Sequence, residues 1–198
     1  MIYGFPHSWN WPVAISGTYG SYAWSPCGQF FSAFNWTSVE IWDSLTLEKH
    51  FSFQLTKPDH ETWDPESECT PPGVLTYSPD GHFLAGYFSS VIIMWDVQTG
   101  GVVEEIECGV INILPQRLVW SSDEKTICSV FLVEAGTWAV FAYDVALGVK
   151  VSTSTFLSSL EPYIWPHNDF LQVVTMPSNG DVKVNVNIFM FNPHSWMT

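Results

Sequence analysis

Ser78-Pro79-Asp80-Gly81 and Met94-Trp95-Asp96 bound the stretch of sequence that decides the fold. Between them lie a short apolar run, residues 83–87, and a tight polar turn at Ser89-Ser90. Proline fixes φ for a turn, and glycine accepts the positive φ that ends it. Short apolar segments separated by such turns are typical of antiparallel strands joined by hairpins. The stretch therefore predicts a meander of short β-strands.

The same pattern recurs along the chain. An earlier copy runs from Ser25-Pro26-Cys27-Gly28 to Ile41-Trp42-Asp43, and in both copies the serine stands 18 positions before the aspartate. A third copy, residues 121–144, is five residues longer, and we expect its additional residues, 133–138, to form a longer hairpin loop. A fourth begins near residue 165 and ends in the alternating strand pattern of residues 184–188. A repeat of about 45 to 53 residues has the size of one four-stranded propeller blade.

These repeats predict an all-β fold, a partial β-propeller of four-stranded antiparallel blades, with about three clear blades, the third of them a degenerate copy, and one doubtful blade. We place a single domain over the whole chain, with its blades at residues 20–56, 73–108, 114–156 and 161–198. An array that does not close into a ring leaves sheet faces and edges uncovered. We therefore expect poor solubility or self-association through open blade edges.

A Ser-Pro-x-Gly turn followed by an apolar strand and a terminal Trp-Asp resembles the WD-repeat family of β-propellers, here over residues 22–144. More narrowly, residues 22–30 and the run from Val97-Gln98-Thr99-Gly100-Gly101 to Ile106-Glu107-Cys108 look similar to WD-repeat arrays of mushroom-type fungi. Those arrays often lie downstream of a nucleotide-binding NACHT module in receptor-like proteins. The resemblance implies a scaffold or sensing role with a protein partner. The chain has no G-x-x-x-x-G-K-[ST] loop, so no nucleotide cofactor is expected.

The repeats depart from the family pattern at the positions of its hydrogen-bonded tetrad. WD repeats carry Gly-His at the start of a blade and an aspartate in the turn between the second and third strands. Here Gly81-His82 lies inside the Ser-Pro-x-Gly turn, and the inter-strand turns hold residues 35–37 (Asn-Trp-Thr) and Ser89-Ser90. We therefore expect the stability of the blades to rest on aromatic and β-branched packing.

The charge balance limits the choice of partner. Twenty acidic residues against six basic ones give a formal net charge of −14. Such a field repels nucleic-acid phosphates and anionic membranes, whereas a basic protein partner is compatible with it. The first twenty residues lack the basic region of a secretory signal, and no stretch approaches the roughly 18 apolar residues of a membrane span. The cysteines, Cys27, Cys69, Cys108 and Cys128, form no C-x-x-C pair, which fits a reducing cytoplasm.

Catalytic and metal sites are not predicted. The connection at residues 56–72 holds acidic side chains, a histidine and a cysteine, but their spacing matches no calcium or zinc loop. Its prolines fit an ordinary long connection. Glu104 and Glu105 are adjacent in an expected strand, where neighbouring side chains point to opposite faces, so they form no acid–base pair. No G-x-S-x-G nucleophile motif is present either.

The aromatic side chains fall into two groups. Those at repeat positions are expected in the core: Trp24, Trp42, Trp95, Trp120 and Tyr143. Trp36, Trp63 and Trp138 lie outside these positions, in expected turns or loops, and are the candidate binding residues, because an exposed tryptophan is costly unless it binds something. They suit a protein-interaction module, the preferred function, or a propeller lectin that stacks sugars, the alternative. An enzyme on a propeller scaffold and a fragment without independent activity are further alternatives.

Overall fold

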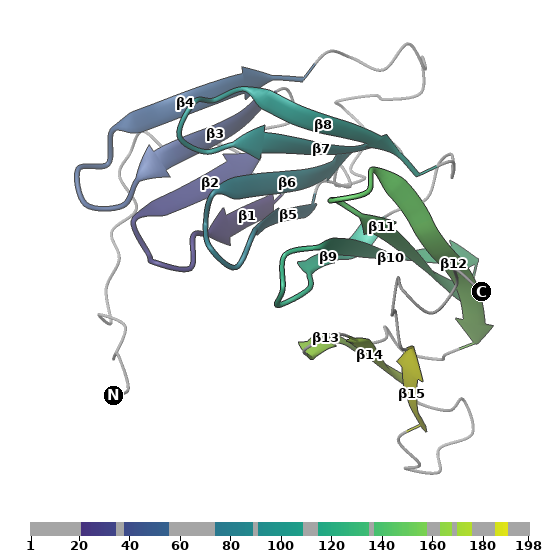
Figure 1. Ribbon diagram of the computed structural model, residues 1–198. Helices are drawn as coiled ribbons and strands as arrows, with labels where there is room; N and C mark the ends of the chain where they lie inside the picture. The colour runs from purple at the N-terminus through teal and green to yellow at the C-terminus, as the bar shows by residue number, and fades with distance from the viewer. Residues whose placement is uncertain are drawn as a thin grey trace, which may run out of the picture.

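A computed structural model gives the fold of the chain (Figure 1). It describes residues 21–34, 38–55, 74–88, 91–108, 115–134, 137–157, 163–167, 170–175 and 185–189. Within these residues the regular structure consists of β-strands, without a helix, in four antiparallel sheets. The predicted all-β, partial-propeller fold is therefore confirmed.

Each sheet is one blade, and its strands are neighbours in chain order. Blade 1 contains β1 (Ser21–Trp24), β2 (Phe30–Phe34), β3 (Ser38–Asp43) and β4 (Lys49–Gln54). Blade 2 contains β5 (Val74–Tyr77), β6 (Phe83–Phe88), β7 (Val91–Asp96) and β8 (Val102–Glu107). Blade 3 contains β9 (Pro115–Trp120), β10 (Thr126–Glu134), β11 (Thr137–Asp144) and β12 (Val149–Leu157). In the described residues blade 4 has three strands, β13 (Tyr163–His167), β14 (Phe170–Thr175) and β15 (Asn185–Phe189).

The additional residues of the third repeat lengthen its strands. β10 and β11 pair from Thr126 opposite Asp144 as far as Glu134 opposite Thr137, with a register shift between Leu132 and Glu134. The longer hairpin loop expected at residues 133–138 is therefore wrong. Residues 126–134 and 137–144 are rich in β-branched and aromatic side chains, so extended pairing buries more of them than a loop would.

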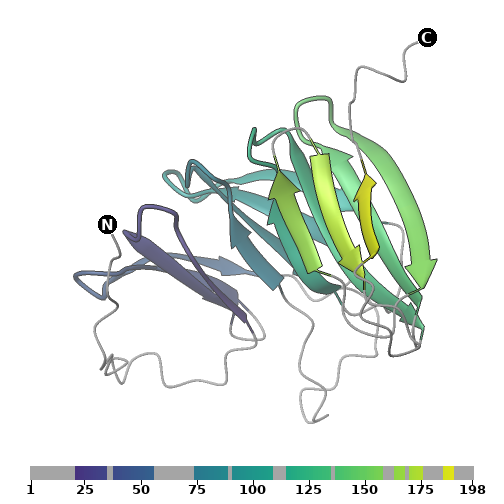
Figure 2. The ribbon, with the colours of Figure 1, turned by 90° about the horizontal axis from the view of Figure 1, so that it is seen from below.

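The blades stack face to face in sequence order and form an arc (Figures 1 and 2). Their first strands pack in succession, β1 against β5, β5 against β9, and β9 against β13. We call the face of a blade that is turned toward the preceding blade its leading face, and the opposite face its trailing face. Because side chains alternate between the two faces of a strand, each blade needs an apolar residue at almost every position.

Aromatic rings fill the interface between blades 1 and 2. The Phe53 ring, on the trailing face of blade 1, stacks on the indole of Trp95, with ring centroids 5.1 Å apart and planes inclined by 16°. Phe51 lies against Gly100, where an added Cβ would stand 2.7 Å from the phenyl ring. Gly100 also has a φ of 71°, so both its backbone conformation and this close approach require glycine.

The interface between blades 2 and 3 has the same composition. The Phe83 and Trp120 rings stack with centroids 6.4 Å apart, and the Tyr143 hydroxyl donates to Glu104 Oε1 at 3.1 Å. Around them lies the largest buried apolar cluster of the described residues, which joins Tyr87, Ile92 and Met94 of blade 2 to the leading face of blade 3. The two interfaces show one rule, in which an aromatic leading face packs on an apolar trailing face.

Four of the five repeat-position aromatics are buried as predicted: Trp42, Trp95, Trp120 and Tyr143. The prediction is wrong for Trp24, which keeps 44% of its surface exposed. Its counterparts Tyr77 and Trp120 are only 7% and 4% exposed, because a preceding blade covers each of them. Trp24 lies on the leading face of blade 1, where the arc of described sheets ends.

Replacing Trp95 by alanine should lower the free energy of unfolding by about 3–5 kcal/mol, because it leaves a cavity beside Phe53 that the stacked sheets cannot refill. Urea unfolding followed by far-UV circular dichroism measures the loss. Val103→Ala, at an exposed position of β8, is the control and should stay within about 0.5 kcal/mol of wild type. Equal effects of the two substitutions would contradict the proposed role of the stack.

Candidate interaction surface

One end of the blades carries two kinds of tight turn. In each of blades 1 to 3, the turn from the first to the second strand lies beside the turn from the third to the fourth strand. Backbone hydrogen bonds join them, from Ser44 N to Gln29 O (2.8 Å) in blade 1 and from Val97 N to His82 O (2.9 Å) in blade 2. Blade 3 repeats the contact, from Val145 N to Lys125 O (2.7 Å). We call this end of blades 1 to 3 the turn end.

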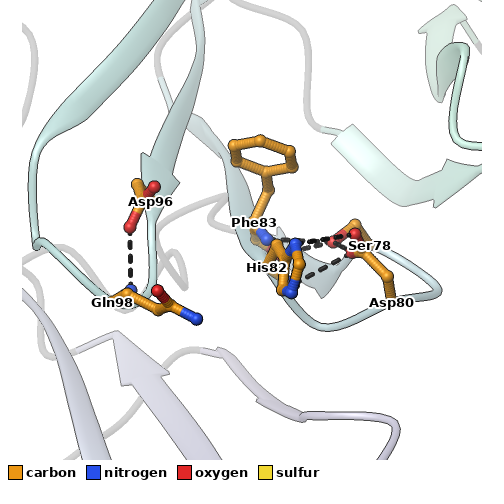
Figure 3. A network of polar contacts seen from close by, with 6 residues as sticks. All are labelled: Ser78, Asp80, His82, Phe83, Asp96 and Gln98. Atoms are coloured by element: carbon orange, nitrogen blue, oxygen red, sulfur yellow. Dashed lines mark hydrogen bonds and ion pairs between the residues drawn. The ribbon is translucent and has the colours of Figure 1, made fainter.

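The serine that begins each turn between the first and second strands accepts a hydrogen bond from the start of the second strand. Ser78 Oγ accepts a hydrogen bond from Phe83 N at 2.9 Å and donates to Asp80 Oδ1 at 2.6 Å (Figure 3). Asp80 Oδ1 also accepts from His82 N at 2.9 Å. Ser25 and Ser121 make the same bond to the second strand, from Phe30 N and Thr126 N. These hydrogen bonds hold the turns in fixed conformations, so the neighbouring side chains project from a well-defined backbone.

The aspartate that ends each third strand caps the following turn. Asp96 Oδ1 accepts from Gln98 N at 2.8 Å (Figure 3). It also accepts from Thr99 N at 2.7 Å. Asp43 Oδ1 holds the turn of blade 1 in the same way. These backbone donors lower the pKa of both carboxyls below the ordinary value of 3.8. The aspartate of the Trp-Asp signature is thus a structural hydrogen-bond acceptor.

A second set of acidic groups gathers between the turns of blades 2 and 3. Burial disfavours the Asp80 carboxylate, but hydrogen bonds from Ser78 and from the His82 amide outweigh it, and the pKa of Asp80 is lowered. His82 Nδ1 lies 3.1 Å from Asp80 Oδ2 (Figure 3). Burial and the negative charge of Asp80 together raise the pKa of Glu124. Lys125 Nζ lies 3.5 Å from Asp123 Oδ2, so this part of the turn end carries three carboxyl groups, Asp80, Asp123 and Glu124, against one ammonium group and has an excess of negative charge.

Two turns place a side chain where their counterparts have glycine. Leu47 has a φ of 60°, and the matching residues of blades 2 and 3 are Gly100 and Gly148. Glu124 has a φ of 64°, at the position held by Gly28 and Gly81 in the other Ser-x-x-Gly turns. A left-handed conformation costs a residue with a Cβ about 1–2 kcal/mol. Both strained residues lie at the turn end.

Exposed leucine side chains stand among these polar groups. Leu45, in the Asp43 turn, is 88% exposed, and Leu147, in the corresponding turn of blade 3, is exposed as well. Leu47 is partly exposed beside Leu45. Leucines on hydrogen-bonded turns next to carboxylates form a surface that combines apolar contact with negative charge.

The three tryptophans singled out from the sequence do not come together in the described residues. Trp138 is 6% exposed and packs with Cys128, Val130 and Val140 on the trailing face of blade 3. Its assignment as an exposed binding residue is wrong, because residue 138 belongs to β11 instead of a loop. Trp36 and Trp63 lie outside the described residues. The signal that could have pointed to the turn end is the missing glycine at Leu47 and Glu124 in the repeat.

The described residues bring together no group of three histidine, cysteine, aspartate or glutamate side chains able to hold a metal ion. They also contain no helix that could cross a lipid bilayer. Of the thiols, Cys27 is exposed, and its hydrogen bond with Ser25 lowers its pKa. Burial raises the pKa of the Cys128 thiol to about 12. Cys27 is therefore the more reactive of these two thiols.

Neither a protein-family model nor a curated protein sequence matches the chain. Solved structures do match. One, described as the crystal structure of the eukaryotic initiation factor, is 15% identical with a TM-score of 0.54 over 85% of this chain and 42% of its own. Another, the crystal structure of the mitotic checkpoint complex, is 17% identical with a TM-score of 0.54 over 79% of this chain and 48% of its own. These likenesses support the propeller fold, and the chain spans less than half of either solved chain.

Acid should destabilise the fold through the turn aspartates. Because the pKa of Asp43, Asp80 and Asp96 is lowered in the folded state, the unfolded chain binds more protons as the pH falls. Their contribution is complete above the unfolded-state pKa and disappears as the pH drops through the folded-state value. Urea midpoints should therefore fall between about pH 5 and pH 2. The dependence should be shallower in Asp43→Asn/Asp96→Asn, and an unchanged slope would show that these carboxylates do not support the turns.

Replacing Leu47 by glycine should raise the free energy of unfolding by up to about 1 kcal/mol. Relief of the left-handed conformation exceeds the entropy that a glycine adds to the unfolded chain. Thermal unfolding measures the change, and Leu45→Gly, in the same turn without a positive φ, is the matched control that should lose stability. A loss of stability in both variants would refute the strain at residue 47.

Proposed function

We propose that the chain is a protein-interaction module of the propeller type, which binds a protein partner at the turn end without catalysing a reaction. The fold shared with chains of the initiation-factor and checkpoint-complex structures supports an interaction role in general. The surface itself supports the choice of the turn end, because it is rigid, partly apolar and built in the same way in three blades.

The observation that carries this proposal is the pair of strained residues, Leu47 and Glu124. Glycine would fit both positions without strain, as it does in the equivalent turns. Backbone strain that is kept at a surface turn is commonly associated with function. In blade 1 the strained turn presents Leu47 beside the most exposed leucine of the described residues, Leu45, as an apolar anchor would be presented to a partner.

The charge of the surface indicates the chemistry of the partner. Asp80, Asp123 and Glu124 lie at the turns of blades 2 and 3, and the whole chain has a formal net charge of −14. Complementarity favours a basic protein segment that carries apolar side chains for the leucines. Attraction between exposed charges is screened by salt, so this binding should weaken as ionic strength rises.

We also propose a cellular location and a general role for the chain. None of the described cysteines Cys27, Cys108 and Cys128 is in a disulfide, which is compatible with action in a reducing cytoplasm. The resemblance to fungal receptor arrays supports a sensing or scaffold role within a larger assembly. A lectin function is not proposed, because Trp138, one of the three tryptophans on which the sugar-stacking alternative was based, is buried.

Capture of partner proteins from a cell lysate tests the proposal. Immobilised wild-type chain should retain a basic protein that is released by added salt, and Leu45→Glu should retain much less of it, since the substitution places a charge at the apolar anchor. Val133→Glu, at an exposed position of β10 beside the β10–β11 hairpin at the opposite end of the blade, is the matched control and should bind as wild type does. The proposal fails if the Leu45 variant captures the same proteins in the same amounts as the control.

A further inference from the structure

Strand β8 forms the outer edge of blade 2. Among the described strands it pairs with β7 alone, and Figure 1 shows it as the outermost strand of its sheet. The first strands of blades 1 to 3 pack against one another, so the opposite edges of these sheets lie inside the stack. Val102, Val103, Glu105 and Glu107 of β8 all have exposed side chains. An exposed edge strand presents backbone donors and acceptors with which a further strand can pair.

The backbone of β8 alternates between the two sides of the strand. Asp96 N donates at 2.9 Å to a carbonyl of the turn that leads into β8, so this end of β7 bonds toward β8. Since successive residues of a strand direct their backbone groups to alternate sides, the residues two and four positions before Asp96 also bond toward β8. Glu104 and Ile106 stand opposite those residues. Glu105 and Glu107 therefore direct their N–H and C=O groups away from β7, toward the outer side of the sheet.

The side chains of Glu105 and Glu107 give this edge its charge. They stand two positions apart and so share one face of the sheet. A strand added outside β8 would place one residue opposite each of them, where a cation stabilises the pair and an anion destabilises it. The sequences of β4 and β12, the outer strands of blades 1 and 3, contain no acidic residue. Among these three blades, an acidic outer edge is therefore particular to blade 2.

We propose that β8 binds an extended segment of a basic protein, which adds to blade 2 as a further strand. Backbone hydrogen bonds with Glu105 and Glu107 hold the segment, and lysine or arginine at alternate positions pairs with the two carboxylates. The exposed Val102 and Val103, at the start of β8, contact an apolar or β-branched residue of the same segment.

Charge makes a second copy of the chain the less suitable occupant of this edge. Pairing of β8 with β8 of another copy would bring glutamate side chains close together, and each chain has a net charge of −14. The same charges attract a basic segment. Glu105 and Glu107 also lie in the half of β8 that is remote from the turn end, since the strand begins at Val102. The inference therefore does not depend on the function proposed for the turn end.

A short synthetic peptide in which lysine and threonine alternate is the probe, and fluorescence anisotropy measures its affinity for the 198-residue chain. The wild type should bind the peptide, less tightly as ionic strength rises. Glu105→Lys/Glu107→Lys should bind about tenfold more weakly, because two attractive cross-strand pairs become repulsive. Glu48→Lys/Glu134→Lys makes the same change in net charge at exposed positions outside β8. This matched control should stay within about twofold of wild type, since salt screens distant charges.

Amide hydrogen exchange followed by NMR identifies the mode of binding. Saturation with the peptide should slow exchange at the Glu105 and Glu107 amides, which point outward, and should affect the amides of Glu104 and Ile106, which already point toward β7, much less. A second peptide, N-methylated on the backbone at every lysine, keeps its charge but lacks the donors that face β8. It should bind about tenfold more weakly, because the backbone acceptors of β8 lose their partners.

Glu105→Gln/Glu107→Gln guards against misfolding, because glutamine has nearly the same shape; it should keep the wild-type circular dichroism spectrum and bind the peptide more weakly. The proposal is overturned if the wild type does not bind, if the N-methylated peptide binds as tightly, if exchange at Glu105 and Glu107 is unchanged, or if the control variant loses as much affinity. Leu45→Glu, which is expected to reduce capture at the turn end, should bind this peptide as wild type does. Either proposal can therefore fail while the other stands.

Discussion

Contact between an aromatic leading face and the apolar trailing face before it holds the described blades together. Phe53 on Trp95 and Phe83 on Trp120 are the clearest instances. In the described part of the chain, the buried indole N–H groups of Trp42 and Trp120 have no hydrogen-bond partner, which costs stability that a satisfied polar network would not cost. The packing of rings and aliphatic side chains offsets that cost, as expected for repeats that lack the hydrogen-bonded tetrad. Which aromatic side chains are buried and which are exposed depends on the faces that are stacked in this way.

The acidic residues of the turns stabilise the turns themselves. Asp43 and Asp96 are occupied by backbone amides, and Ser78 holds Asp80 in a fixed position. These carboxylates are held in place by their hydrogen bonds, and their lowered pKa means that they stay charged to a lower pH than a free aspartate does. The turn end is consequently a rigid, negatively charged surface on which the strained Leu47 and Glu124 are the exceptions. Rigid exposure of apolar and charged groups suits recognition, because little entropy is lost when a partner binds.

The exposure of a leading face depends on its place in the stack. The leading faces of blades 2 and 3 are buried, and that of blade 1 keeps Tyr22 and Trp24 exposed. Each repeat contacts only its neighbours, so the exposure of a face depends on whether another described blade lies against it.

The sequence by itself determined the unit of the fold. Turn residues at fixed offsets and apolar runs of strand length require the hairpins from Ser25 to Asp43 and from Ser78 to Asp96, because these constraints are local. Only the tertiary structure decided which side chains are covered. This is why the burial of two tryptophans is the opposite of what the sequence predicts. Trp24, at a repeat position, is largely exposed, and Trp138, outside those positions, is buried. The alternation of a strand shows that it has two faces, whereas the burial of either face depends on a neighbouring sheet that lies far away in the sequence.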